Sequence, residues 1–334
     1  MSPNVFPKTS LEGRLLFAVP KKGRLNGAAL NLLEGADIQF RRENRLDIAL
    51  VKNLPIALIF LPAADIPTFV GEGRVDLGIT GYDQVQEHDA GVRSVNRKRR
   101  FSGEITPEEE SERSAATGCE TVMDLAFGAC KLQVQVPEKG SYATPKDLIG
   151  KNIGTSFVHL TEKYFANLEI ESGHEDIMGG KIKTNIIELS GSVEAACALG
   201  VADGIVDLVE SGETMKAAGL KAIDTVVESS AILIKSRAPS NPDLVDLIAS
   251  RIRGVIAAQR FVLCQYNIQR GSLSTATKIA PGKRAPTITT LDEDGWVAVS
   301  VMVEKKKIAL VMDELTKVGA TDILVLQIAN TRSD

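Results

Sequence analysis

The side chains best suited to chemistry gather in one segment, residues 188–214, which reads ELSGSVEAACALGVADGIVDLVESGET. Its end places Ser211, Gly212 and Thr214 in an expected turn from a strand into a helix. A glycine lets backbone N–H groups approach a phosphate, hydroxyls add donors, and the start of a helix carries partial positive charge. The turn is therefore either a phosphate-binding loop or a plain helix N-cap at Ser211 with a turn glycine.

Two acidic residues, Asp203 and Asp207, precede this turn and lie four positions apart. Carboxylates are unusual beside a bound phosphate unless a divalent cation or sugar hydroxyls are bound there as well. If the turn does bind phosphate, the segment therefore predicts a ligand that also carries a sugar or a metal ion.

A second loop, PKKGRL at residues 20–25, follows the first expected strand and carries Lys21, Lys22 and Arg24. Ligands of open α/β sheets bind outside the carboxyl ends of strands. A solvated basic turn is the alternative interpretation. Three cations beside a glycine at a strand end favour a binding role.

A third loop, DLGITGYD at residues 76–83, again runs from a strand into a glycine turn and presents Thr80 and Asp83. Ordinary turn chemistry accounts for the glycines by themselves. Three such loops at strand ends are harder to explain as ordinary turns than any one of them, so the set favours a shared site.

Alternating strands and helices position these loops. Apolar runs predict strands at residues 14–19, 46–51, 57–61, 75–79, 131–136, 151–154, 183–189, 204–209 and 231–234. Helical spacing predicts helices at residues 25–33, 66–73 and 160–168, and another that ends near residue 199. This order predicts α/β layers with a largely parallel sheet.

The pattern breaks between residues 93 and 118, where a basic block precedes an acidic block and apolar residues are few. A solvated surface insertion is the expected structure. A nucleic-acid patch is the alternative, but the acidic half neutralises the basic half and aromatic residues do not interleave with the charges.

The chain after residue 241 has a different texture. It predicts an amphipathic helix at 244–258, and then strands at 261–268, 287–291, 296–303 and 322–328 with helices at 272–279 and 306–318. After the first helix the order is βαββαβ, the ferredoxin-like pattern, and it indicates a separate small domain.

Composition excludes several other classes of protein. The 334 residues suggest two or three domains, and 44% hydrophobic with 25% charged residues is typical of a globular chain. A net charge of −4 does not favour nucleic-acid binding. We find neither a membrane-length apolar run nor a signal-peptide pattern, so a cytoplasmic protein without membrane contact is expected. The spacing of the cysteines and histidines predicts no zinc site.

Together these segments resemble the ATP phosphoribosyltransferase family in its long form, the enzymes of the first step of histidine biosynthesis. The matching pieces lie in family order at residues 14–25, 73–81, 191–194, 202–214 and 319–325. The stretch from Gly191 to Thr214 is the most specific, and the resemblance extends over almost the whole chain.

The resemblance implies a fold and a reaction. The fold is α/β: a two-lobed, periplasmic-binding-protein-like catalytic part, with lobe I at 1–128 and 209–236 and lobe II at 129–208, plus a C-terminal ferredoxin-like regulatory domain at 237–334. The reaction joins ATP to phosphoribosyl pyrophosphate with Mg²⁺ and gives phosphoribosyl-ATP and pyrophosphate. Histidine is the implied feedback inhibitor, and the implied assembly is a homo-oligomer, either a dimer or a hexamer.

The resemblance also assigns residues to these roles. The implied site of the sugar 5′-phosphate is Ser211, Gly212, Glu213 and Thr214. Ribose hydroxyls or Mg²⁺ are assigned to Asp203 and Asp207. Catalytic roles fall to Lys21, Arg24 and Glu194. Further substrate contacts are expected from Lys52, Thr80 and Asp83.

Two local features depart from the family pattern. Ser211 stands where the family usually has threonine, which keeps the hydroxyl, and AACAL at residues 195–199 replaces a stretch that usually contains Ala-Pro. The rival hypothesis is a binding protein, either a solute-binding module or an inactive regulatory homologue. The first should carry a signal peptide and the second should have lost the phosphate turn, so the sequence favours an enzyme.

Overall fold

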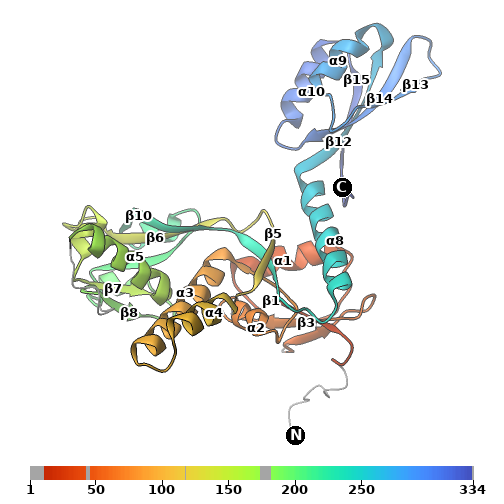
Figure 1. The fold of residues 1–334 in the computed structure, drawn as a ribbon. Coiled ribbons are helices and arrows are strands. Elements are labelled where there is room, and N and C mark those ends of the chain that lie inside the picture. The colour runs from red at the N-terminus through yellow and green to blue at the C-terminus, as the bar shows by residue number, and fades with distance from the viewer. Residues whose placement is uncertain (1–10, 43–45, 117, 174–181, 333–334) are drawn as a thin grey trace. The chain divides into compact units, whose positions relative to one another are not determined.

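The computed structural model describes residues 11–42, 46–116, 118–173 and 182–332 (Figure 1). The chain divides into two compact units: Met1–Ala29 with Phe40–Val245, and Leu30–Gln39 with Asp246–Asp334. We call them the catalytic unit and the C-terminal unit. The predicted boundary at residue 237 precedes the helix α8 (Pro242–Arg260), whereas the division of the chain lies inside this helix.

Lobe I of the catalytic unit is built on a six-stranded sheet in the order β2-β3-β1-β4-β11-β5. Its strands are β1 (Leu15–Pro20), β2 (Ile48–Leu50), β3 (Ile56–Leu61), β4 (Leu77–Gly81), β5 (Glu120–Asp124) and β11 (Ala231–Lys235). β1 runs parallel to β3 and β4, while β2, β11 and β5 pair antiparallel with their neighbours. Every residue of β4 is buried, as in strands covered on both faces.

The helices of lobe I follow its strands. They are α1 (Arg24–Gly35), α2 (Ile66–Gly71) and α3 (Tyr82–Phe101). α1 begins directly after the loop that follows β1, and α3 begins directly after β4. The two predicted loops of lobe I therefore lie where a strand ends and a helix begins, which is where this class of fold binds ligands.

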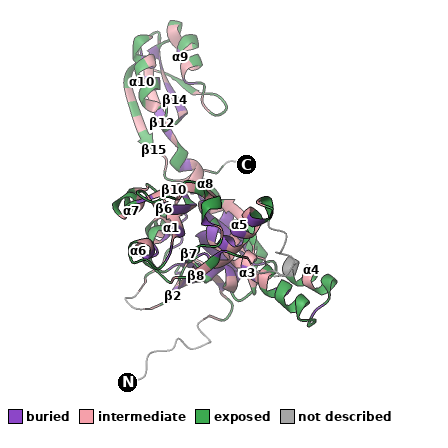
Figure 2. Cartoon of the chain, turned by 90° about the vertical axis from the view of Figure 1, so that its left-hand side faces the viewer, coloured by how far each residue is buried: buried purple, intermediate pink, exposed green. Residues whose placement is uncertain are grey.

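Lobe II is built on a five-stranded sheet in the order β10-β6-β9-β7-β8. Its strands are β6 (Cys130–Pro137), β7 (Asn152–Thr155), β8 (Asn185–Glu188), β9 (Gly204–Val209) and β10 (Leu220–Ser229). Its helices are α5 (Val158–Glu171), α6 (Ala195–Ala198) and α7 (Glu213–Ala217). Figure 2 shows buried residues where α5 packs on β7, and this is the core of the lobe.

The strand β10 corrects the predicted division of the catalytic unit. The sequence assigned residues 209–236 to lobe I, but β10 pairs with β6 in the lobe II sheet, and only β11 joins the lobe I sheet. The chain therefore returns to lobe I at Ser230. Alternation did not reveal β10 because its register shifts between Ala222 and Asp224 and again between Thr225 and Val227, and such bulges interrupt the period of two.

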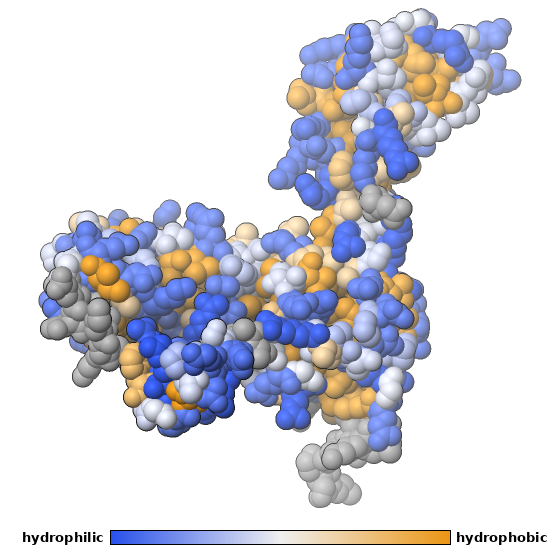
Figure 3. Space-filling view, viewed as in Figure 1, coloured by the Kyte–Doolittle hydropathy of each residue, from blue (hydrophilic) through white to orange (hydrophobic). Residues whose placement is uncertain are grey.

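The segment expected as a surface insertion is helical. α3 continues to Phe101, and α4 (Pro107–Ala116) folds back against it. The pair is stabilised by an ion pair of 3.1 Å between Arg100 Nη1 and Glu110 Oε2 and by the buried side chains of Asn96 and Ile105. The remaining side chains are mostly exposed and hydrophilic, so the segment is solvated as expected, and it is helical (Figure 3).

The C-terminal unit confirms the predicted ferredoxin-like domain. It contains β12 (Phe261–Gln269), α9 (Leu273–Ile279), β13 (Thr287–Thr290), β14 (Trp296–Glu304), α10 (Ile308–Lys317) and β15 (Thr321–Gln327). The strand order β13-β14-β12-β15 is antiparallel throughout. Alternate residues of β12 and β14 are buried, and this strict period is what made both strands predictable.

No described helix is both long enough and apolar enough to cross a membrane. All four cysteines, Cys119, Cys130, Cys197 and Cys264, are free thiols. Burial is the largest cause of a raised pKa in each, and it raises the pKa of Cys119 and of Cys197 to about 11. Cys130 and Cys264 are buried, and Cys119 and Cys197 are partly buried.

Candidate active site

Loops from both lobes meet around a small cavity of about 160 Å³. The loop after β1 contributes Lys22 and Arg24, the loop after β4 contributes Gly81 and Asp83, and β9 of lobe II contributes Leu208. The residues after Leu208 lead directly into the turn at 211–214. The loops after β1 and β4 therefore line one cavity together, and lobe II reaches it at Leu208, just before the turn at 211–214.

Arg24 lies at the centre of this convergence, with a side chain that is 25% exposed. Its guanidinium donates to the carbonyl oxygen of Gly128 at 2.6 Å and to Cys130 Sγ at 3.1 Å. It also lies 3.6 Å from Asp83 Oδ1 and 3.3 Å from Glu210 Oε1. Because Gly128 and Cys130 belong to the segment that enters lobe II, Arg24 joins the lobe I loop to the crossing between lobes.

Asp83 is fully buried and completes the same network. Its carboxylate accepts from the hydroxyl of Ser229, and its backbone N–H donates to that hydroxyl at 2.9 Å. Ser229 is the last residue of β10, immediately before the chain returns to lobe I. Arg24 and Asp83 thus hold both crossings between the lobes, and their polar atoms already have protein partners.

The other lobe I candidates are divided between the surface and the interior. Lys21 is partly exposed and forms an ion pair of 2.8 Å with Asp47 Oδ1. Lys52 is exposed in the turn between β2 and β3. Thr80 is fully buried, and its hydroxyl donates to the Ala63 carbonyl oxygen at 2.7 Å, so it fixes a loop rather than facing the cavity.

The lobe II turn is open to solvent. Gly212 has φ of +79°, a left-handed conformation that a residue with a Cβ adopts only under strain. Ser211 Oγ accepts a long hydrogen bond of 3.4 Å from the backbone N–H of Glu213. Ser211, Glu213 and Thr214 are exposed, and among the described residues the Thr214 hydroxyl has no protein partner.

Asp203 and Asp207 do not share a site. Asp203 precedes β9 and Asp207 lies near its end, so four residues of strand separate them by about 13 Å. Asp203 accepts from the Tyr142 hydroxyl at 3.0 Å and from the Asn152 N–H at 3.0 Å, which assigns it to the fold of lobe II. The described residues contain no group of three or more metal-ligating side chains.

Asp207 lies in a different environment. Burial raises the pKa of its carboxyl group, and the negative charge of Glu194 raises it further, although the N–H of Leu208 opposes the shift. Glu194 lies at the start of α6 and is half-buried. The two carboxylates therefore form an acidic pair on lobe II, at the carboxyl half of β9.

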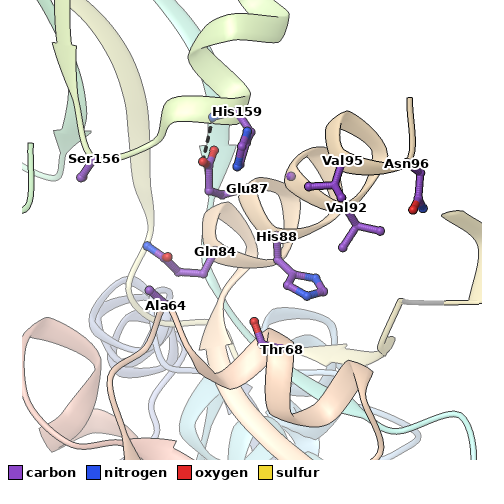
Figure 4. Close-up of a pocket in the computed structure, with 11 residues that line it drawn as sticks. Ala64, Thr68, Gln84, Glu87, His88, Val92, Val95, Asn96, Ser156 and His159 are labelled. Carbon is purple, nitrogen blue, oxygen red and sulfur yellow. Dashed lines mark hydrogen bonds between the residues drawn. The ribbon is translucent and has the colours of Figure 1, made fainter. Parts of the chain in front are cut away.

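A larger cavity of about 410 Å³ lies between α2, α3 and α5 (Figure 4). Its lining includes Gln84, Glu87 and His88 from α3 and Ser156 and His159 from lobe II. Sequence reasoning missed Glu87 and His159, because no motif contains them. The available signal was the spacing of Asp83, Glu87 and Gly91, which places all three on one face of a helix.

Comparison with known proteins identifies close relatives of this chain. Residues 62–254 match the family described as ATP phosphoribosyltransferase, and residues 258–330 match the family described as HisG, C-terminal domain. The ATP phosphoribosyltransferase of Yarrowia lipolytica is 59% identical over 97% of this chain and 98% of its own length. That of Saccharomyces cerevisiae is 53% identical over 96% of this chain and 98% of its own.

A solved structure resembles the fold. It is the ATP phosphoribosyl transferase (HisG:HisZ) complex from Thermotoga maritima, which matches with a TM-score of 0.53 and 22% identity. The match covers 73% of this chain and 98% of that chain. At this identity the match supports the two-lobed α/β architecture alone.

Proposed function

The chain belongs to the ATP phosphoribosyltransferase family, and we propose that its two lobes divide the work of that reaction between them. The enzyme acts in histidine biosynthesis and transfers the phosphoribosyl group of phosphoribosyl pyrophosphate to N1 of ATP. Phosphoribosyl-ATP and pyrophosphate are the products. In this proposal lobe II binds the phosphoribosyl part of the donor. Lobe I supplies cations for anionic phosphates, and its Arg24 and Asp83 hold the crossings between the lobes.

The chemistry asks for alignment and for neutralisation of charge. Adenine N1 attacks C1 of the ribose with its own lone pair, so the step needs no strong general base. The bond from C1 to pyrophosphate breaks, and positive charge develops on the ribose ring in the transition state. The protein therefore has to orient two phosphate-rich substrates and stabilise the departing pyrophosphate.

The turn at residues 211–214 is the proposed site of the 5′-phosphate, and its open geometry carries the proposal. The left-handed Gly212 exposes backbone N–H groups, and the hydroxyls of Ser211 and Thr214 are accessible to a ligand. Neighbouring N–H and hydroxyl donors of this kind bind phosphate oxygens. Glu213 adds its backbone N–H to this set.

The acidic pair of Asp207 and Glu194 suits the sugar of the donor. A carboxylate accepts hydrogen bonds from ribose hydroxyls, and a negative charge near C1 favours the positive charge of the transition state. We assign Asp207 to the ribose hydroxyls and Glu194 to the orientation of the substrate. Asp203 has no part in this assignment, because its two oxygens are used inside lobe II.

Cations of lobe I are proposed to receive the anionic phosphates. Lys22 lines the smaller cavity and Lys21 lies exposed in the same loop, whereas Lys52 precedes β3 and lies at the opposite, amino end of these parallel strands. Lys21 would have to leave its ion pair with Asp47, which costs little because exposed pairs contribute only about 0–1 kcal/mol. Arg24 contributes charge from its network with Asp83 rather than as a free side chain.

The residues that the structure describes do not fit a dedicated magnesium site. Asp203 and Asp207 are too far apart to bind one cation, and no group of metal-ligating side chains occurs among the described residues. We propose that Mg²⁺ arrives as part of the substrate, bound to its pyrophosphate, which is a common mode for this ion. No step of the reaction is assigned to a metal held by the protein.

Histidine inhibition, a homo-oligomeric state and a cytoplasmic location are further proposals from the family resemblance. The C-terminal unit has its own sheet and core, which supports a separate regulatory role for it. Inhibition across domains requires a coupling free energy of about 1–3 kcal/mol. Hydrogen exchange of the full chain with and without histidine tests this directly, and the proposal predicts new protection in residues 246–332.

Removal of the C-terminal unit by truncation is a poor test of histidine inhibition, because Leu30–Gln39 belongs to the same compact unit. Leu32, Leu33 and Ile38 in this segment are buried, and removal of the C-terminal unit would expose apolar surface. If histidine protects only catalytic-unit residues of the full chain, the regulatory assignment is wrong.

One assay tests the division of labour. The purified protein is given ATP, phosphoribosyl pyrophosphate and Mg²⁺, and the absorbance of phosphoribosyl-ATP is followed for the wild type and a Ser211→Ala/Thr214→Val variant. The proposal predicts product from the wild type and a raised KM for phosphoribosyl pyrophosphate, but not for ATP, in the variant. An equal rise in both KM values would contradict it.

A further inference from the structure

One face of α3 faces lobe II along its whole first half. Asp83, Glu87 and Gly91 are spaced by four residues and therefore lie on the same face of the helix. Asp83 binds Ser229 at one crossing, Glu87 binds the start of α5, and Gly91 packs against the His159 ring. We call this face the α3 seam.

Glu87 lies at the centre of the α3 seam and supplies the N-terminal cap that α5 lacks. The residue before α5, Phe157, has a side chain that cannot cap a helix. Glu87 of lobe I takes this role, because its Oε1 accepts from the His159 N–H at 2.8 Å and its Oε2 accepts from the Leu160 N–H at 2.8 Å. A carboxylate at the start of a helix also interacts favourably with the helix dipole.

Partial burial disfavours the charged form of the Glu87 carboxyl group. It raises the pKa of this group, while the two N–H donors and the charge of His159 oppose that shift. The other charged groups nearby are Glu162, which faces His159 from α5, and the adjacent pair of His88 and Asp89. The two N–H donors of α5 supply the hydrogen bonds that a partly buried carboxylate requires.

Gly91 keeps the α3 seam close. A Cβ added at Gly91 would lie 2.7 Å from His159 Cδ2, well inside ordinary contact. Figure 4 shows the His159 ring beside Glu87, and the backbone N–H of His159 donates to the Glu87 carboxylate. The two hydrogen bonds therefore join α3 to α5, and the missing side chain leaves room for the His159 ring between them.

We propose that Glu87 is a positioning residue for phosphoribosyl transfer, because its carboxylate caps α5 and thereby fixes the spacing of the two lobes across the cleft. α3 starts immediately after the β4 loop of lobe I, and α5 starts just after the β7 loop of lobe II. A change in the α3 seam would therefore shift the loop after β4 on lobe I relative to the loop after β7 on lobe II. An error of about 1 Å in alignment can cost on the order of 100-fold in rate.

The test is a comparison of Glu87→Gln with Glu162→Gln in the full chain. Both changes remove one negative charge near His159, but only the first removes a hydrogen bond of the cap. The inference rests on the transferase activity, so wild-type activity is measured in parallel. For Glu87→Gln we expect kcat to fall on the order of 10- to 100-fold with smaller changes in both KM values.

A second readout separates positioning from a merely structural role. Amide exchange in residues 158–161 should accelerate in Glu87→Gln and stay unchanged in Glu162→Gln, at a temperature where both proteins are fully folded. Glu87→Asp, whose carboxylate is shorter by one methylene, should recover part of kcat. Faster exchange at α5 with wild-type kcat would overturn the proposal.

Gly91→Ala keeps the test decisive if Glu87→Gln does not fold. The added methyl group must displace His159 while the Glu87 carboxylate stays in place. We expect a fall in kcat of about tenfold without substrate selectivity. Faster amide exchange in residues 158–161 of Gly91→Ala, together with unaltered kinetics and an active wild type, would overturn the proposal.

Discussion

The two sides of the cleft differ in how far their polar groups are already bonded within the protein. On lobe I, Arg24 and Asp83 are paired with each other and with both crossings between the lobes, and Asp83 is fully buried. On lobe II, the hydroxyls of Ser211 and Thr214 are exposed in a turn with few internal hydrogen bonds. One side is already satisfied by the protein, and the other is open to a ligand.

This difference separates side chains that hold the structure of the site from side chains that can bind a substrate. A charged side chain at a strand end is compatible with either role, and its type and spacing do not decide between them. The state of its hydrogen bonds does, because a group with its partners in place gains little from a ligand. The comparison predicts unselective defects on lobe I and substrate-selective defects on lobe II.

The largest effect is expected on lobe I. Asp83→Ala leaves Arg24 without its buried partner and should destabilise the fold by about 2–3 kcal/mol, less than for a fully buried pair because Arg24 is 25% exposed. Denaturant unfolding measures this, and titration should show both substrates weakened by similar factors. Asp47→Asn is the control, since the exposed Lys21 pair should contribute under about 1 kcal/mol. Loss of affinity for only one substrate would contradict the prediction that changes at Arg24 and Asp83 affect both substrates equally.

The next effect is expected in the turn. Thr214→Val removes a hydroxyl that is free to bind a charged phosphate, a contact of about 1.5–3 kcal/mol. Calorimetry should show weaker binding of phosphoribosyl pyrophosphate and unchanged binding of ATP. Thr214→Ser should restore affinity, because it keeps the hydroxyl. Equal losses for both substrates would place the turn elsewhere in the site.

A smaller effect is expected for Asp203. Asp203→Asn weakens its bonds with Tyr142 and Asn152, and unfolding should show a loss of about 1 kcal/mol. The magnesium concentration for half-maximal activity should stay the same, because Asp203 belongs to the fold of lobe II. A shift in the magnesium requirement would restore the paired-aspartate site.

The smallest effect on stability is expected for Asp207, and its sign depends on pH. Because the folded-state pKa is raised by burial, the group favours folding below its unfolded pKa near 3.8 and loses that contribution as pH rises through the folded value. Asp207→Asn should therefore be slightly stabilising at pH 7 and neutral at pH 3. The same variant should bind phosphoribosyl pyrophosphate more weakly. Destabilisation at pH 7 would show that the hydrogen bond from the Leu208 N–H to the carboxylate outweighs the cost of burial.

Regular patterns made much of the fold predictable. The alternation in β12 and β14 yielded the C-terminal βαββαβ domain, and apolar runs bounded by glycine located β1, β4 and β9. β10 was not predicted because two bulges interrupt its period. α3 was missed for a related reason, since its first half carries few apolar residues and its role is to meet lobe II.

The site was predictable in its components but not in its connections. The turn with Gly212 follows from local chemistry, so the sequence indicated it. Arg24 bonds to Gly128, and Ser229 bonds to Asp83. Both bonds join residues more than a hundred positions apart, which no local spacing can reveal. The cap of α5 by Glu87 is likewise a tertiary contact between two helices that lack any shared motif.

Competition by ribose 5-phosphate tests the central claim most directly, because this compound carries only the groups assigned to lobe II. We predict that it competes with phosphoribosyl pyrophosphate and not with ATP. We also predict that its inhibition constant rises about tenfold or more in Thr214→Val, as expected for a lost hydrogen bond to a charged group. Competition with ATP instead, or an unchanged inhibition constant in Thr214→Val, would contradict the assignment of the turn.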